Sequence, residues 1–301
     1  KSHHHAREHA AAKSTPIGAL GKGVRSQFQQ SQHRPGKTVD RVCSRGQPVS
    51  TLNLFTALVT LHIASGAFGL VSFWIPIAGA KGAREHRRFG RWFINTMLIT
   101  GMVAIGMATL TIIAPSATHP QLQDHKVFGD AAQIRAIFGW MMLYLAMLTV
   151  NLAWQGKLSL ANRAAPERNR AWHNLLSQGL LTLAAVNCVW QGVIAEQWMM
   201  VGIAMIGFAT VGTNLWFIYK RPLKPTDYIK EHIKSLVGAG ISVYTAFFAF
   251  GAVRLVPELA LTPGLWAIPL VTGLTLIIYH QRAVVRGRTA SNVPNRWRQS
   301  A

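Results

Sequence analysis

The chain has 301 residues and a net charge of +21, which comes from 31 Lys and Arg against 10 acidic residues. Half of the residues are hydrophobic and only 14% are charged, whereas soluble domains carry about 25% charged residues. This composition argues against a soluble protein. Because the basic residues lie in short segments between apolar blocks, it also argues against nucleic acid as the partner.

Residues 1–50 form a basic tail without sustained apolar periodicity. The tail holds nine Lys or Arg and only two acidic residues, Glu8 and Asp40. We expect it to be disordered, and its charge favours docking on a protein partner or on anionic lipid. Its Arg-rich, acid-poor character resembles the end of an organelle-targeting sequence. The predicted location is therefore a bacterial inner membrane or an organellar inner membrane.

Seven apolar blocks follow, and each is long enough to cross a bilayer as a helix with a rise of about 1.5 Å per residue. They cover residues 51–79, 92–115, 134–155, 172–195, 198–219, 235–256 and 264–279. The sequence therefore predicts an all-α, polytopic transmembrane helix bundle with about seven spans over residues 51–283. A basic C-terminal tail, residues 284–301, completes the chain.

The basic residues alternate between the connecting loops. The first, third and fifth loops and the C-terminal tail hold nineteen Lys or Arg, while the opposite loops hold only Lys126, Arg135 and Arg254. By the positive-inside rule, the first group faces the cytoplasm or its organellar equivalent, which leaves the N-terminus outside. The basic N-terminal tail contradicts this orientation, so counts of six or eight spans stay open.

None of the acidic residues falls inside a predicted span, and Glu231 is assigned to the loop before the sixth block. A proton- or sodium-coupled transporter generally needs a carboxylate near the midplane of the membrane, so this class is disfavoured. The polar residues inside the spans are amides: Asn95, Asn151, Gln178, Asn187, Gln191 and Asn214. They either bond between helices or line a polar cavity, and helix packing is the favoured interpretation.

Histidines are the candidate ligands for a cofactor. His62 is expected near mid-membrane in the first span, where an imidazole usually bonds a neighbouring carbonyl. The alternative is axial ligation of a b-type haem, which needs a second imidazole at a similar depth. Four more histidines are expected on one membrane face, where they would suit a transition metal, a haem or a quinone: His86, His173, His232 and His280.

Motifs of soluble enzymes are missing from the sequence. It contains no G-x-x-x-x-G-K-[ST], H-E-x-x-H or G-x-S-x-G pattern, and Cys43 and Cys188 have no metal-ligand spacing. A non-enzymatic role is favoured, such as an accessory or assembly subunit of a membrane complex. A haem- or metal-binding redox protein and a small-solute transporter are the alternatives.

Two parts of the chain carry a family resemblance: residues 61–93, and residues 227–254 together with 265–282. The residues that carry it are His62, Gly66, Gly69, Lys81, Gly82, His86, Arg87 and Gly90 in the first part, and His232, Gly238, Thr245, Ala246, Phe247, Trp266 and Pro269 in the second. The chain resembles an uncharacterised family of bacterial multipass membrane proteins over about residues 51–283. The resemblance implies several transmembrane helices and no particular activity or cofactor.

Overall fold

The computed structural model describes residues 50–122, 130–251 and 263–287, and every regular element in these ranges is helical. The all-α prediction is therefore confirmed for this part of the chain. Nearly all of the N-terminal tail, residues 1–49, and residues 288–301 of the C-terminal tail lie outside the described residues. The predicted roles of the N-terminal tail stay predictions.

The long helices match the apolar blocks closely at several boundaries. They are α1 (Thr51–Ala78), α2 (Arg84–Ile113), α5 (Met142–Ala161), α6 (Trp172–Ile194), α7 (Trp198–Tyr219), α8 (Pro225–Ala246) and α9 (Pro263–Val285). Short elements connect or extend them: α3 (Pro115–Thr118), η1 (Pro120–Leu122), α4 (Ala131–Ile134), the π-helical η2 (Arg135–Met141), η3 (Pro166–Arg170) and the π-helical η4 (Phe247–Gly251).

Local side-chain chemistry fixes where several helices begin. Ser50 caps α1, since its hydroxyl accepts a 3.1 Å hydrogen bond from the Asn53 amide. At the start of α8, Pro225 occupies the first turn, and the Asp227 carboxylate accepts a 2.9 Å hydrogen bond from the Lys224 amide. These caps satisfy backbone donors that a helix leaves unpaired at its N-terminus.

The C-terminus of α1 is closed by a lysine from the following turn. The Lys81 ammonium donates to the carbonyl oxygen of Pro76 at 2.9 Å and also to the carbonyl oxygen of Ile77. The last carbonyl groups of a helix have no helical donors, so a cation there is stabilising. Burial lowers the pKa of Lys81. This contact fixes the short turn between α1 and α2.

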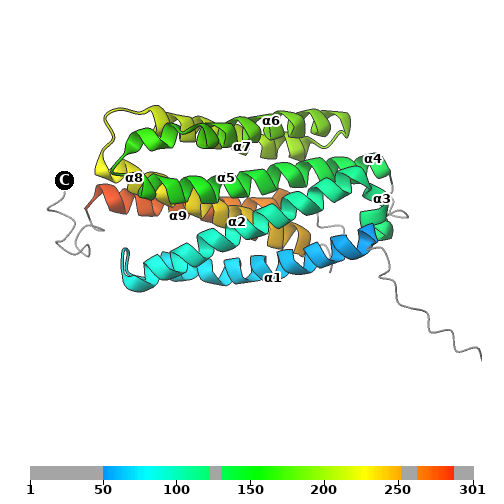
Figure 1. Ribbon diagram of the computed structural model, residues 1–301, viewed down its shortest axis with the longest axis horizontal. Helices are drawn as coiled ribbons and strands as arrows, with labels where there is room; N and C mark the ends of the chain where they lie inside the picture. The colour runs from blue at the N-terminus through cyan, green and yellow to red at the C-terminus, as the bar shows by residue number, and fades with distance from the viewer. Residues whose placement is uncertain (1–49, 123–129, 252–262, 288–301) are drawn as a thin grey trace, which may run out of the picture. The chain divides into compact units, whose positions relative to one another are not determined.

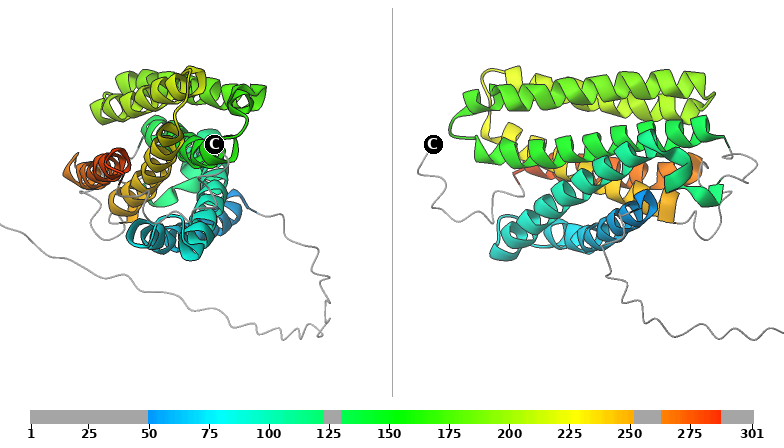
Figure 2. Two further views of the ribbon diagram at one scale, coloured as in Figure 1. Left: turned by 90° about the vertical axis from the view of Figure 1, so that its left-hand side faces the viewer. Right: turned by 45° about the vertical axis from the view of Figure 1, so that its right-hand side comes forward.

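The helices pack as a chain of neighbours. α1 lies against α2, α2 against α5, α5 against α8, and α8 against α9, while α6 and α7 form a pair that contacts α5. Figures 1 and 2 show α5 between the α6 and α7 pair on one side and the α1 and α2 pair on the other. α5 therefore contacts four of the long helices, α2, α6, α7 and α8.

Successive long helices run in opposite directions (Figure 1). The connections 79–83, 162–171 and 220–224 therefore lie at the same end as the C-terminal turn of α9, and we call this the basic end. The alternation of charge in the sequence predicts this grouping, because loops one, three and five are the basic ones. Which side of a membrane the basic end faces stays a prediction.

Five helical segments of the described chain are long and apolar enough to cross a membrane, rather than the seven predicted. They are Thr51–Ala78, Arg84–Ile113, Ala131–Ala161, Trp198–Tyr219 and Gly264–Val285. α6 and α8 fall short because α6 carries amide side chains along its length and α8 carries Asp227, Lys230, Glu231 and Lys234. Five such helices identify an integral membrane protein that contacts the lipid bilayer.

The distribution of burial fits this assignment. Met97, Tyr144 and Leu181 are fully buried in the core between the helices. Large apolar side chains such as Val71 and Leu183 are about two-thirds exposed, as expected for residues that face lipid tails rather than water. Small residues on α8 allow close packing, since a Cβ at Gly240 would overlap the ring of Phe73 on α1.

Candidate functional site

A cluster of three buried amides joins α5, α6 and α7. The amide nitrogen of Asn214 on α7 donates to the Asn151 side-chain oxygen on α5 at 2.9 Å and to the Gln178 side-chain oxygen on α6 at 3.1 Å. All three side chains are at most 2% exposed. Asn151 in turn donates to Ser177 at 3.0 Å. The predicted bonding between helices is therefore present for these three amides.

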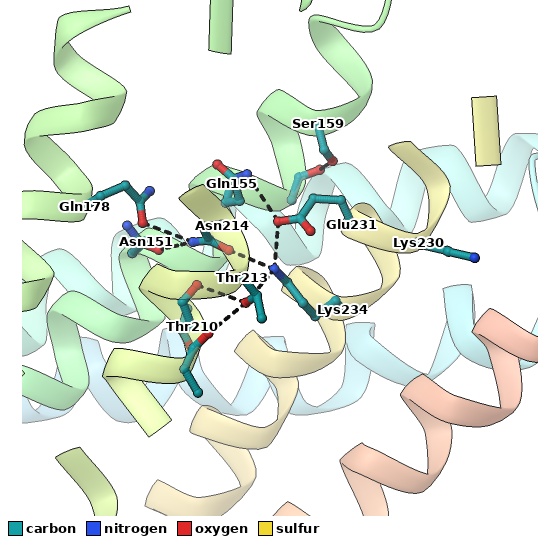
Figure 3. Close-up of polar contacts among 12 residues, drawn as sticks. Asn151, Gln155, Ser159, Gln178, Thr210, Thr213, Asn214, Lys230, Glu231 and Lys234 are labelled. Carbon is teal, nitrogen blue, oxygen red and sulfur yellow. Dashed lines mark hydrogen bonds and ion pairs between the residues drawn. The ribbon is translucent and has the colours of Figure 1, made fainter. Parts of the chain in front are cut away.

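An ion pair on α8 continues this cluster (Figure 3). The Lys234 ammonium lies 2.9 Å from the Glu231 carboxylate, and it also donates to the side-chain oxygen of Asn214 at 2.9 Å and to the Thr213 hydroxyl at 3.0 Å. These three acceptors match the three protons of the ammonium group. Gln155 on α5 donates to Glu231 at 3.2 Å. We call the connected set of Asn151, Gln155, Gln178, Thr213, Asn214, Glu231 and Lys234 the polar network.

The assignment of Glu231 and Lys234 to a loop is wrong. Glu231 was assigned to a loop, because the charged residues before Ser235 interrupt the apolar run. In the structure, α8 begins at Pro225, so Glu231 lies about two turns inside the helix with its side chain only 7% exposed. The signals that would have found it are the helix-start pattern of Pro225 and Asp227 and the helical spacing of Tyr228, Glu231 and Ser235, which are all buried.

A small cleft reaches the ion pair from the basic end. Its volume is about 160 Å³, and both Glu231 and Lys234 line it. The other lining residues are Thr213, Trp216, Phe217, Lys220, Asp227, Lys230 and Gln281. Lys220 and Asp227 form a second ion pair at 2.9 Å within the same cleft. The charged part of the polar network is therefore partly open, while the amide part is closed.

Several buried polar atoms at the network have no hydrogen-bond partner. They are the side-chain oxygen of Gln155, the side-chain nitrogen of Gln178 and the hydroxyl oxygen of Ser235. Most buried polar groups in proteins are paired, either within the protein or with bound water. The network thus offers both a free acceptor and a free donor to water or to a small polar molecule.

His62 bonds the neighbouring helix. Its Nδ1 atom lies 3.3 Å from the carbonyl oxygen of Thr100 on α2, and one turn further along α1 the Ser65 hydroxyl accepts a 2.8 Å hydrogen bond from Thr100. This is the packing arrangement expected of a lone imidazole inside a span. It ties α1 to α2 through side chains that are partly buried.

The remaining candidate histidines divide into two places. His86 lies beside Lys81, because both side chains bond the carbonyl oxygen of Pro76. His173 lies elsewhere, against the rings of Trp154 and Trp172. Within the described ranges, no three His, Cys, Asp or Glu side chains are grouped as metal ligands. Binding of haem or a metal by these histidines stays a prediction.

Two of these histidines also bond backbone carbonyl groups. His86 Nδ1 lies 3.1 Å from the carbonyl oxygen of Pro76, and His232 Nδ1 lies 2.8 Å from that of Gly156. Such a bond fixes the orientation of an imidazole and leaves Nε2 as its remaining nitrogen. The helix ends at the basic end are therefore joined by side chain to backbone contacts.

Comparison with known proteins does not assign this fold to a family. No family model matches the chain, and neither a curated protein nor a solved structure is significantly similar to it. The resemblance to bacterial multipass membrane proteins is thus supported only at the level of a multipass helical architecture. The functional argument therefore depends on the geometry of the polar network.

Proposed function

We propose that this integral membrane protein transports a small polar solute and that the polar network is its binding site. The observation that carries the proposal is the contact of the Glu231 and Lys234 ion pair with a buried amide cluster at one side and with an open cleft at the other. Charged groups within a membrane bundle are costly and usually mark a path for a solute or an ion.

The composition of the network favours a solute with both donor and acceptor groups. The unpaired Gln178 nitrogen donates, whereas the unpaired Gln155 oxygen and the Glu231 carboxylate accept. Lys234 contributes its positive charge, because its three protons already have acceptors within the network. A zwitterion or a polyhydroxy compound would complement these groups better than a hydrocarbon. The basic end supplies the entry, because the cleft opens beside Lys220 and Lys230.

This proposal differs from the expectation from the sequence, which favours an accessory subunit over a transporter. The transporter class is disfavoured from the sequence because no acidic residue is expected inside a span near the midplane. What now supports it is Glu231, a carboxylate buried among the helices about two turns inside α8. The accessory-subunit hypothesis depends on the N-terminal tail, which lies almost wholly outside the described residues. The haem or metal hypothesis has no grouped ligand set within the part of the chain that the structure describes.

A solute screen tests the proposal. The purified protein in detergent is heated with each member of a panel of amino acids, small carboxylates, amines and sugars, and a ligand raises its melting temperature. We expect at least one solute to stabilise the wild-type protein but not Glu231→Gln. The matched control is Glu85→Gln, which removes an exposed carboxylate at the same end of the bundle.

Uptake measurements then separate transport from binding. Any stabilising solute is offered in radiolabelled form to liposomes that contain the wild-type protein, Glu231→Gln or Glu85→Gln. We expect accumulation with the wild-type protein and Glu85→Gln only. If no solute of the panel stabilises the wild-type protein, or if Glu231→Gln accumulates the solute equally well, the proposal is wrong.

A further inference from the structure

A second cleft lies at the basic end, between α8 and the last turns of α9. Its volume is about 310 Å³, and it is lined by Lys230, Ile278, Gln281, Arg282, Val285 and Arg286. Three of these six residues are cationic, and none is acidic. A cleft of this composition attracts an anion, since its charge is not balanced by a carboxylate in its wall.

The cations of this cleft are available for a ligand. Within the described residues, neither Arg282 nor Arg286 forms an ion pair. The nearby acidic residues belong to the neighbouring cleft, where Asp227 pairs with Lys220 and Glu231 pairs with Lys234. Lys230 points away from the polar network (Figure 3). The charge of the cleft is thus separate from that of the polar network.

The geometry of the cleft is fixed by the two helices. Arg282 and Arg286 are four residues apart on the chain, so they lie on the same side of the helical end. The Gln281 side chain donates a 3.2 Å hydrogen bond to the carbonyl oxygen of Lys230, which ties the end of α9 to α8. Guanidinium groups in this arrangement suit the oxygens of a phosphate ester.

An apolar stripe leads from the membrane interior to these cations. Along α9, Val271, Leu274, Ile278 and Val285 are each between 46% and 66% exposed. Their spacing of three, four and seven residues places them on one face of the helix. Ile278 and Val285 line the cleft itself, so the apolar face continues into the cationic site. A free phosphate ion would use the cations but not this stripe.

We propose that the cleft between α8 and α9 binds the phosphodiester headgroup of an anionic phospholipid, whose acyl chains lie along the apolar stripe of α9. Lys230, Arg282 and Arg286 contact the headgroup, and Ile278 and Val285 contact the upper part of a chain. Basic pockets between membrane helices bind anionic headgroups by this combination of charge and apolar contact. The site uses none of the residues of the polar network. Lys230 and Gln281 line both clefts, so Arg282 and Arg286 are the cations that belong to the lipid site alone.

Lipid-dependent stabilisation tests this site. The full chain in detergent is titrated with phosphatidylglycerol, with phosphatidylcholine, or with inorganic phosphate at matched ionic strength, and its melting temperature is recorded. We expect phosphatidylglycerol to raise the melting temperature more than phosphatidylcholine, and inorganic phosphate to have no effect. The triple variant Lys230→Gln/Arg282→Gln/Arg286→Gln should weaken the apparent affinity for phosphatidylglycerol by at least about tenfold, since each surface cation contributes to headgroup attraction.

Two further variants keep the test decisive. The first is the single variant Arg286→Gln. Arg286 is exposed and lies just beyond the end of α9, so the variant protein should fold normally. We expect its affinity for phosphatidylglycerol to fall by about threefold. The matched control, Arg84→Gln/Arg91→Gln, removes two exposed arginines near the same end from α2 and should keep the wild-type affinity. If the control loses as much affinity per charge removed as the triple variant, the attraction comes from net charge alone. If inorganic phosphate stabilises the protein as much as phosphatidylglycerol does, the cleft is a free-anion site. Either result would overturn the lipid assignment.

Discussion

Lys234 on α8 donates a 2.9 Å hydrogen bond to the side-chain oxygen of Asn214 on α7. This single contact joins the ion pair to the amide cluster, so four helices share one set of polar interactions. Polar contacts of this kind are non-additive, because each one orients the groups that make the next. We therefore expect the loss of one charge and the loss of the whole Glu231 and Lys234 ion pair to change the stability of the protein by different amounts.

Removal of one charge from the ion pair should destabilise the protein. Glu231→Gln leaves the Lys234 ammonium without its counter-ion, and Lys234→Met leaves the Glu231 carboxylate without its counter-ion. The Glu231 side chain is 7% exposed and the Lys234 side chain is 21% exposed. We expect each single variant to lose about 2–3 kcal/mol of unfolding free energy, because an unpaired buried charge is costly. Unfolding in a titration with a denaturing detergent measures this loss.

The double variant Glu231→Gln/Lys234→Met should recover most of that stability, since a buried ion pair is often replaceable by neutral side chains. In contrast, it should not recover the solute-dependent stabilisation or the uptake proposed above. A double variant that transports as well as the wild-type protein would assign the pair a purely structural role.

Asn214 should be the most sensitive of the buried amides. Asn214→Ala removes the donor to Asn151 and Gln178 and one acceptor of Lys234. We expect a loss of about 2–3 kcal/mol, because each partner is left buried without its hydrogen bond. The control is Asn187→Ala on α6, a half-buried amide outside the network, which should change the stability by less than about 0.5 kcal/mol. Similar losses for both variants would mean that the network gives Asn214 no special role.

The sequence predicts the helices well because their boundaries depend on local chemistry. The blocks 172–195 and 198–219 nearly coincide with α6 and α7, since Trp residues mark their starts and polar or basic residues mark their ends. The grouping of the basic loops follows from the alternating direction of the helices. The helix boundaries and the grouping of the basic loops can both be predicted from the order of residues along the chain.

The sequence does not predict the polar network, because the network depends on contacts between distant segments of the chain. Hydropathy places Glu231 and Lys234 in a loop, since a charged side chain lowers the apolar average whether it faces water or an amide on another helix. The pairing of Asn151 with Asn214 joins residues 63 positions apart, and nothing in the spacing of either indicates the other. The positions of His86, His232 and His280 relative to one another are not predictable for the same reason, because they depend on how α2, α8 and α9 pack.

A third prediction concerns the contact between α1 and α8. A Cβ at Gly240 would overlap the ring of Phe73, which is only 6% exposed and packs against Phe93 at a ring distance of 5.4 Å. Because this ring has little room to move, Gly240→Ala should cost about 1–3 kcal/mol through overpacking. Gly202→Ala on α7 is the control, since an added methyl group there meets no atom within 4 Å. An unchanged melting temperature for Gly240→Ala would show that α1 and α8 are not packed this closely.

The last prediction concerns acid stability and His119, which lies in the connection between α2 and α4, outside the candidate spans. Its ring packs against Phe55 at 5.1 Å and Phe138 at 5.0 Å. Burial lowers the pKa of His119 to about 4. Between this value and the pKa of about 6.5 expected for the unfolded chain, the unfolded state binds the proton more readily, so stability falls as the pH falls through this window.

The expected loss between pH 7 and pH 4 is as much as about 2 kcal/mol once the partial exposure of the ring is allowed for. His119→Phe retains an aromatic ring between Phe55 and Phe138 but cannot take up a proton. The variant should therefore melt near the wild-type temperature at pH 7.5 and above it at pH 4.5, and thermal unfolding at both pH values measures the difference. If acid lowers the melting temperature of the two proteins equally, the titrating group lies elsewhere in the bundle.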